Sequence, residues 1–406
     1  MTTSTLDLDP VLGPAHKSVP SALWGRRASE VAAERHPVTA FATPLLVLDR
    51  AASDANVATL TSWAAERGIE LMPHGKTTMA PALWRHLLDA GCRGITVATP
   101  WQAQVARAAG VERILIANEV VDPVGAAWVA AELDAHPGCE IVCWADSAAS
   151  AAVLAATAGE RPIDVLVELG GAGGRTGARG IAAALEVAEA VAAEPRLRLR
   201  GVAGYEGSYG SDRRTQTVAR VRAYLAELAS FADAMLTAHE LPDPIVSAGG
   251  STWFDLVAQE LAPLAGRARI VLRSGAFQAH DDLFYARTAG LPFHPALTVF
   301  ARVVSRPEPE LVVLDAGKRD MPVDYDPPVV LHTADGRAVR GARVTALNDQ
   351  HAHVAVAADA VLAVGEVVLL GISHPCGAFD RWRLVPEVDD ARGPDPRVVG
   401  FVATVF

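Results

Sequence analysis

The most constraining feature of this 406-residue chain is a regular alternation of short β-rich runs with longer Ala/Leu-rich helical segments between about residues 40 and 265. Strands that alternate with helices predict right-handed βαβ units and therefore a parallel sheet. Eight such units in about 225 residues favour a closed (β/α)8 barrel over the alternative, an open doubly wound sheet. We predict the strands at Leu45–Asp49, Glu70–His74, Ile95–Thr99, Ile114–Asn118, Glu140–Ala145, Asp164–Leu169, Leu199–Tyr205 and Ile245–Ala248.

The pattern of residue types changes after about residue 270. Val- and Leu-rich runs separated by Pro, Gly and Asp turns replace the helical segments, for example at Ala296–Val304 and Glu366–Leu370. Such a pattern predicts a β domain without crossover helices. We therefore expect an N-terminal extension over residues 1–40, packed on the β domain or at an interface. A barrel over residues 41–270 and a C-terminal β domain over residues 271–406 would follow it.

Charge and hydropathy exclude two classes of partner. The net charge is −11 and Lys and Arg are not clustered, which does not suit a protein that binds nucleic-acid phosphates. No apolar run reaches the roughly 18 residues that a membrane span needs, and the first residues lack the features of a signal peptide. Four cysteines in so long a chain are too few for a disulfide framework. The expected compartment is therefore a reducing cytoplasm.

The position of one lysine carries chemical information. Chemistry in such barrels lies at the C-terminal ends of the strands. Lysine is scarce in this chain, because only Lys17, Lys76 and Lys318 of the 36 basic residues are lysines. Lys76 follows the second predicted strand. Desolvation at a strand mouth favours the neutral amine, which condenses with carbonyl groups. A lone lysine there is more often a solvated loop residue, so Lys76 needs support from the other strand ends.

Three later strands end in glycine-rich segments. Glu168 opens the run Glu-Leu-Gly-Gly-Ala-Gly-Gly-Arg-Thr-Gly, in which Arg175 offers a planar cationic fork. The next strand ends at Tyr205, and the last predicted strand runs into Ser247–Thr252 before a helix. Backbone N–H groups of a glycine-rich loop at a helix N-terminus form an anion site, and barrels often bind phosphate at their last strands. A phosphate site at one mouth and an amine at another describe an aldehyde cofactor held at both ends.

These motifs together resemble a known family. Pro73-His74-Gly75-Lys76-Thr77 is similar to the Schiff-base lysine motif of the D-serine dehydratase and D-threonine aldolase family, relatives of bacterial alanine racemases. The resemblance covers about residues 40 to 400 and implies a fold-type III pyridoxal-phosphate enzyme, usually a homodimer with active sites completed across the interface. Lys76 is then the catalytic candidate. The cofactor-binding candidates are His74, Lys76, Glu168, Arg175, Thr176, Tyr205, Ser247, Gly249, Gly250 and Ser251.

A second motif, Ser373-His374-Pro375-Cys376-Gly377, points to a metal. Residues i and i+2 of an extended segment face the same side, so an imidazole and a thiolate at this spacing can chelate one ion. This ligand pair favours Zn²⁺ over Mg²⁺ or Mn²⁺. An isolated His-x-Cys is a weak signal. The resemblance strengthens it, because eukaryotic D-serine dehydratases bind zinc through His-x-Cys, whereas D-threonine aldolases typically have His-x-Asp.

The resemblance thus predicts a pyridoxal-phosphate- and zinc-dependent dehydratase that converts a D-3-hydroxy amino acid, such as D-serine or D-threonine, to a 2-keto acid and ammonia. One alternative is metal-activated retro-aldol cleavage, as in D-threonine aldolases. Another is a non-catalytic pyridoxal-phosphate carrier, but such carriers resemble the barrel alone. Arg273-Ser274-Gly275 and His280-Asp281 resemble the segment that in relatives enters the partner's active site. Phe277 and His280 replace expected aromatic positions there, so the substrate pocket is less defined than the cofactor site.

Overall fold

The computed structural model describes residues 6–406, so the first five residues of the expected N-terminal extension lie outside the described residues. The chain forms two compact units, and each is assembled from separated segments. Unit 1 contains Leu60–Lys76 and Leu87–Gly275, together with Leu6. Unit 2 contains Asp7–Thr59, Thr77–His86 and Ala276–Phe406. The sequence pattern suggested contiguous domains, whereas unit 2 also takes in segments from the first quarter of the chain.

Unit 1 is built on a curled sheet of eight parallel strands in the spatial order β2-β10-β9-β8-β6-β5-β4-β3, and the short β7 (Ala178–Arg179) pairs with β6. The two end strands of the curl are bridged, because Thr96 donates its backbone N–H to Pro73 O at 2.9 Å and its hydroxyl to Met72 O at 2.6 Å. The strands are β2 (Glu70–Leu71), β3 (Ile95–Val97), β4 (Arg113–Glu119), β5 (Glu140–Ala145), β6 (Ile163–Gly170), β8 (Leu197–Gly204), β9 (Ile245–Ala248) and β10 (Arg269–Leu272).

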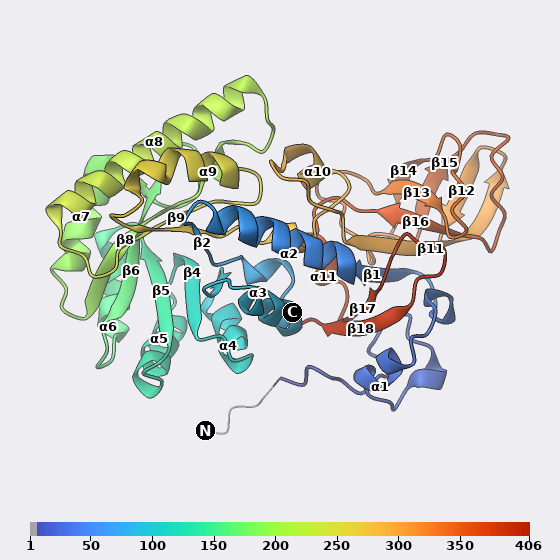
Figure 1. Cartoon of the computed structure of the whole chain (residues 1–406), viewed down its shortest axis with the longest axis horizontal. Helices are drawn as coiled ribbons and strands as arrows, with labels where there is room; N and C mark the ends of the chain where they lie inside the picture. Colours follow the sequence, from blue (N-terminus) through green and yellow to red (C-terminus); the bar gives the residue numbers. More distant parts are fainter. Residues whose placement is uncertain (1–5) are drawn as a thin grey trace. The chain divides into compact units, whose positions relative to one another are not determined.

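Helices cover the outer side of these strands, as Figure 1 shows. Side-chain caps fix where several helices begin, since Thr99, Asp122 and Ser147 accept backbone N–H groups at the starts of α4, α5 and α6. Every residue of β6 is buried, as expected of a parallel strand covered on both faces. The helices are α4 (Pro100–Ala108), α5 (Pro123–Ala135), α6 (Ala148–Thr157), α7 (Ile181–Ala192), α8 (Thr215–Ala238) and α9 (Phe254–Leu261).

One strand predicted for the barrel lies elsewhere. Leu45–Asp49 forms β1, which pairs with β11 (Leu297–Glu308) and β17 (Leu384–Val388) in the sheet of unit 2. Its place among the eight barrel strands is taken by β10, between β9 and β2. The prediction was wrong because a short, wholly buried apolar run looks the same in either sheet. The loop at Gly249 therefore follows the seventh barrel strand.

Unit 2 contains a nine-stranded sheet, which confirms the predicted β domain. Most of its path runs β14-β15-β12-β11-β1-β17-β18, and β16 pairs with both β11 and β13. Residues from the N-terminal segment, among them Leu12, Val31 and Phe41, share an apolar core with β1 and β17. The remaining strands are β12 (Leu311–Leu314), β13 (Val329–Thr333), β14 (Arg343–Leu347), β15 (Ala352–Ala355), β16 (Val367–Gly371) and β18 (Val398–Ala403).

Among the described residues, five α-helices lie wholly or partly in unit 2. Four of them are α1 (Ala28–Ala33), α10 (Phe284–Thr288) and α11 (Cys376–Phe379), together with the first part of α2 (Arg50–Ala65). The fifth, helix α3 (Pro81–Asp89), likewise contains residues of both units. Over residues 6–406, no helix has both the length and the apolar character that crossing a bilayer requires.

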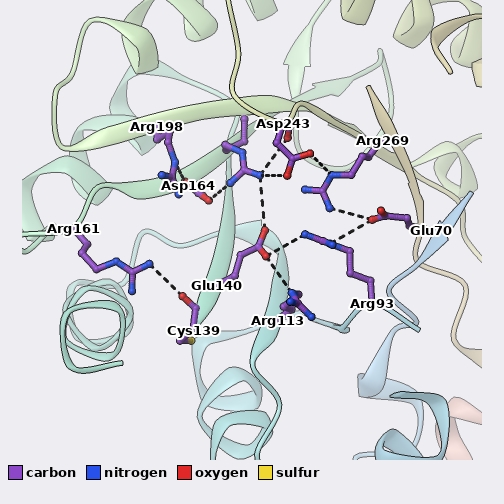
Figure 2. Close-up of polar contacts among 11 residues, drawn as sticks. Glu70, Arg93, Arg113, Cys139, Glu140, Arg161, Asp164, Arg198, Asp243 and Arg269 are labelled. Atoms are coloured by element: carbon purple, nitrogen blue, oxygen red, sulfur yellow. Dashed lines mark hydrogen bonds and ion pairs between the residues drawn. The ribbon is translucent and has the colours of Figure 1, made fainter. Parts of the chain in front are cut away.

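The N-terminal ends of the unit 1 strands are joined by a ring of ion pairs (Figure 2). Each arginine of the ring contacts two carboxylates, at distances between 2.8 and 3.9 Å. Asp164 on β6 adds a buried contact to Arg200. In parallel barrels this end carries stability, while chemistry lies at the opposite end. The ring runs through Glu70, Arg269, Asp243, Arg200, Glu140 and Arg93, and returns to Glu70.

Candidate active site

A cavity of about 150 Å³ lies at the C-terminal ends of the unit 1 strands. The structure brings together there an amine, a cationic fork and a glycine-rich loop that are far apart in the sequence. The predicted residues that line the cavity are His74, Lys76, Arg175, Tyr205, Gly249 and Gly250. The predicted residues outside its lining are Glu168, Thr176, Ser247 and Ser251. Its other lining residues are Ala98, Ala117, Asn118, Trp144 and Arg273, none of which was predicted as a cofactor ligand.

Lys76 and His74 enter the cavity from the segment after β2. Lys76 lies in the 3-10 turn Gly75–Thr77 and is exposed, so the chain by itself does not provide the desolvation that we expected. His74 donates its backbone N–H to Arg273 O at 3.0 Å. Its ring Nδ1 is buried without a hydrogen-bond partner among the described residues. Burial, followed by the charge of Lys76, holds the pKa of His74 well below its usual value, so the ring is neutral and offers a polar atom to a ligand.

Arg175 and Tyr205 form a second wall. The guanidinium carbon of Arg175 lies 4.6 Å from the centroid of the Tyr205 ring, a cation–π distance. The backbone N–H of Tyr205 donates to the Tyr224 hydroxyl at 3.0 Å, and that hydroxyl donates to Leu169 O at 2.7 Å. The buried Tyr224 therefore fixes the ends of β6 and β8 relative to each other and holds this wall in place.

The glycine-rich loop after β9 binds an anion that belongs to the chain itself. The backbone N–H groups of Gly249 and Gly250 donate to the carboxylate of Glu206, at 3.1 and 2.6 Å. Gly249 has a φ of +99°, and a Cβ there would lie 2.5 Å from Leu272 Cδ2, so only glycine suits the position. The two amides are an anion-binding donor set, which fits a phosphate group. A phosphate on these same amides would have to replace Glu206, whose role the sequence analysis missed although it follows the end of β8.

Arg273 is a buried member of this cavity that the sequence analysis assigned differently. Its guanidinium donates to Ser247 Oγ at 2.7 Å and to Gly204 O at 2.8 Å, and lies 4.8 Å from the Trp144 ring centroid. The resemblance placed the segment containing Arg273 in a partner's active site. The structure places it in this chain's own barrel, because Arg273 directly follows β10, the strand that the pattern did not reveal.

A pair of buried carboxyl groups lies at the ends of β4 and β6. Among residues 6–406, the oxygens of Glu119 and Oε2 of Glu168 have no hydrogen-bond partner other than each other. Burial, and then the nearby Glu168 carboxylate, raise the pKa of Glu119 to about 8. The pair therefore holds a proton at neutral pH. Glu168 was predicted as a cofactor ligand, but its carboxyl group contacts Glu119 and does not line the cavity. Trp144, on the intervening strand β5, lines the cavity.

His374 and Cys376 lie in unit 2, in a turn and not in the extended segment that we predicted. His374 has a φ of +63°, Pro375 has helical dihedral angles and Cys376 begins α11, because the chain turns directly after β16. The side chains still meet. Burial lowers the pKa of His374, but its contacts with Cys376 and Asp324 outweigh this effect and raise it to about 9. Cys376 Sγ also lies 3.3 Å from the hydroxyl of Thr77, the residue after Lys76.

The zinc prediction rests on these two side chains alone. Within the part of the chain that the structure describes, no group of three or more His, Cys, Asp or Glu residues is arranged to hold a metal ion. Cys92, Cys139 and Cys143 are buried, and burial raises the pKa of the Cys143 thiol to about 12, so it stays protonated. Cys376 is partly exposed, and is thus the thiol best suited to a metal.

Comparison with known proteins agrees with this architecture. Residues 48–260 match the alanine racemase N-terminal domain, and residues 296–388 match a serine dehydratase domain. A D-threonine aldolase from an Arthrobacter species is 31% identical over 351 residues, which are 85% of this chain and 88% of that protein. The crystal structure of D-threonine aldolase from Filomicrobium marinum covers 91% of this chain and 97% of its own, with 25% identity and a TM-score of 0.77. D-threo-3-hydroxyaspartate dehydratase from a Delftia species covers 90% and 97%, with 24% identity and a TM-score of 0.71.

An alanine racemase-like barrel joined to a β domain defines the class as fold-type III pyridoxal-phosphate enzymes. Within that class, the chain belongs to the D-serine dehydratase and D-threonine aldolase family, and it is a pyridoxal-phosphate-dependent lyase. The predictions of family, fold and enzyme class are therefore confirmed. The family contains both aldolases and dehydratases, so membership alone leaves the reaction open.

Proposed function

We propose that this lyase is a zinc-dependent dehydratase that releases ammonia and a 2-keto acid from a D-3-hydroxy amino acid such as D-serine or D-threonine. The observation that carries the proposal is the contact between Cys376 and His374, which brings a thiol sulfur and an imidazole together on one turn. This pair favours zinc over the harder ions that a carboxylate would select. Among the dehydratase relatives, one structure is of a cysteine-to-alanine variant in a metal-free form, and another is of a histidine-to-alanine variant, the two positions separated by one residue.

Pyridoxal phosphate supplies an aldehyde that condenses with amines and a ring that accepts electrons from the substrate's α-carbon. Lys76 is the residue that would hold it covalently, and its amine would then accept the substrate's α-proton. The amides of Gly249 and Gly250, which now bind a carboxylate, would hold the phosphate. Arg175 and Tyr205 would orient the ring, and the unpaired Nδ1 of His74 would accept a hydrogen bond.

His374 and Cys376 would hold a zinc ion, which would act as a Lewis acid and make the substrate's β-hydroxyl a better leaving group. Two protein ligands leave coordination positions open for a hydroxyl, as a catalytic zinc requires. The Thr77 hydroxyl is 3.3 Å from Cys376 Sγ and would donate to this sulfur, which orients it toward the ion.

A substrate screen tests this proposal. D-serine, D-threonine, D-threo-3-hydroxyaspartate and phenylserine would be incubated with enzyme loaded with pyridoxal phosphate and zinc, and ammonia and 2-keto acid scored against aldehyde and glycine. We expect ammonia release to dominate. Predominant aldehyde release would instead support the second candidate, an aldolase, which the 31% identical relative favours.

The variant Cys376→Asp sharpens the test, because it converts the ligand pair to the harder set typical of the aldolase branch. We expect weaker zinc binding, better use of Mn²⁺ and a fall in ammonia release. Cys139→Ala, which alters a buried thiol of unit 1, is the matched control and should leave the product ratio unchanged. An unchanged ratio and zinc affinity in Cys376→Asp would remove Cys376 from the proposal.

A further inference from the structure

The His374 side chain is held from several directions within unit 2. Its backbone N–H donates to Asp281 Oδ2 at 2.9 Å, and its ring Nδ1 is hydrogen-bonded to Asp324. Three aromatic rings surround the imidazole, with centroid distances of 4.8 Å to Tyr325, 6.0 Å to Tyr285 and 6.1 Å to Phe284. Asp281, Asp324 and the three rings therefore restrain both the backbone and the ring of His374.

Asp324 determines which ring nitrogen remains available. Because its carboxylate occupies Nδ1, the Nδ1 proton stays in place when a metal ion displaces the proton of Nε2, and Nε2 becomes the ligand atom. A carboxylate on the far nitrogen of a metal-binding histidine fixes the tautomer and the ring orientation, and makes the other nitrogen a better ligand. Asp324 itself does not join His374 and Cys376 in a three-ligand cluster within the described residues.

Asp281 determines the backbone geometry. Its carboxylate is fully buried and also accepts the N–H groups of Leu283 and Tyr285, both at 2.9 Å. His374 has a φ of +63°, a conformation that is strained for a non-glycine residue. The hydrogen bond from His374 N to Asp281 ties this strained residue to the turn that carries Phe284 and Tyr285.

We propose that Asp324 and Asp281 are positioning residues of the metal site, with Asp324 directing Nε2 of His374 toward the ion and Asp281 fixing the His374 backbone. The inference rests on the proposed zinc site and adds two carboxylates that do not touch the metal. His374 and Cys376 lie in a turn and not in the extended segment that the His-x-Cys pattern suggested. The turn brings the two ligands together, and the carboxylates keep it in one conformation.

Metal titration of the full-length protein, loaded with pyridoxal phosphate and stripped of metal, tests the proposal. Zinc affinity would be measured by competition with a chromophoric chelator, and the site geometry by the absorption spectrum of bound Co²⁺. We expect Asp324→Asn to weaken zinc binding about 10- to 100-fold and to alter the Co²⁺ spectrum. Asp349→Asn removes an exposed carboxylate of the same unit and should bind zinc as the wild type does.

Asp281→Asn removes a buried acceptor, so its thermal unfolding would be measured alongside zinc binding. If it folds, we expect weaker zinc binding and a broadened Co²⁺ spectrum; if it does not, Asp324→Asn alone decides. Equal zinc affinity and identical Co²⁺ spectra for Asp324→Asn and Asp349→Asn would overturn the inference. A wild-type protein that binds no zinc would overturn the proposed zinc dependence itself, so the two failures are distinguishable.

Discussion

Gly250 shows how little room the glycine-rich loop after β9 leaves for a side chain. A Cβ at this position would lie 3.1 Å from Tyr205 Cε2 and 3.4 Å from Glu206 Oε1. Gly250→Val should therefore displace Tyr205 or Glu206 and weaken pyridoxal-phosphate binding at least about tenfold, equivalent to ~1.4 kcal/mol. The affinity is measured by absorbance or fluorescence titration. Gly138→Val, at a position with open space around it, is the control, and equal affinities in the two variants would remove Gly250 from the site.

Glu119 should make the stability of the protein depend on pH. Its folded-state pKa of about 8 is above its ordinary value of 4.5, so the folded state binds a proton that the unfolded state has lost. Stability linked to this group is therefore fully present below about pH 4.5 and falls as the pH rises toward 8. Glu119→Gln removes the ionisation. The wild type should therefore lose up to about 4 kcal/mol of unfolding free energy relative to Glu119→Gln between pH 5 and pH 9.

Urea unfolding of both proteins at the two pH values measures this loss. Glu186→Gln, an exposed change in the same unit, should follow the wild type at both values. A constant difference between Glu119→Gln and the wild type would mean that Glu119 ionises normally in the folded protein.

At the scale of elements, the ion-pair ring stabilises the N-terminal ends of the barrel strands (Figure 2). The side chains of Arg200 and Asp164 are 8% and 4% exposed, so removing Arg200 leaves a buried carboxylate with one partner fewer. Arg200→Met should lower the free energy of unfolding by about 3 to 5 kcal/mol. Arg113→Met alters a side chain that is 49% exposed and should cost less than about 1 kcal/mol. Denaturant unfolding measures both, and equal losses would contradict the difference in burial.

The elements also show what the sequence could and could not predict. The sequence predicted that Lys76 and Gly249 lie at the site, because a strand end followed by a distinctive residue is a local signal. β1 was assigned to the wrong sheet and β10 was not predicted, because a four- or five-residue apolar run does not reveal its pairing partner. Glu206 and Asp324 were missed for a related reason. Their roles depend on contacts with residues more than 40 positions away along the chain, which no local pattern contains.

At the scale of the whole molecule, the family resemblance predicts a homodimer with shared active sites, and this stays a prediction. The cavity of unit 1 already contains Lys76, Arg273 and the glycine-rich loop from one chain. Lys76 is exposed in one chain, so residues of a second subunit or a bound substrate could desolvate it. We therefore expect a second subunit to affect substrate binding more than it affects the residues proposed to hold the cofactor.

The metal should support chemistry and not folding. Unit 2 has an extensive apolar core that includes Phe379 and Trp382, close to the metal turn, so the turn is anchored without an ion. Structural zinc sites, by contrast, are closed by four protein ligands, and only two are predicted here. Chelation should therefore abolish turnover while the circular dichroism spectrum and the cofactor's visible absorbance stay unchanged, and the melting temperature should fall only by the contribution of ion binding. Added zinc should restore activity to the wild type but not to Cys376→Ala. If metal-free enzyme converted its best substrate at the untreated rate, neither His374 nor Cys376 would have a part in the reaction through a metal.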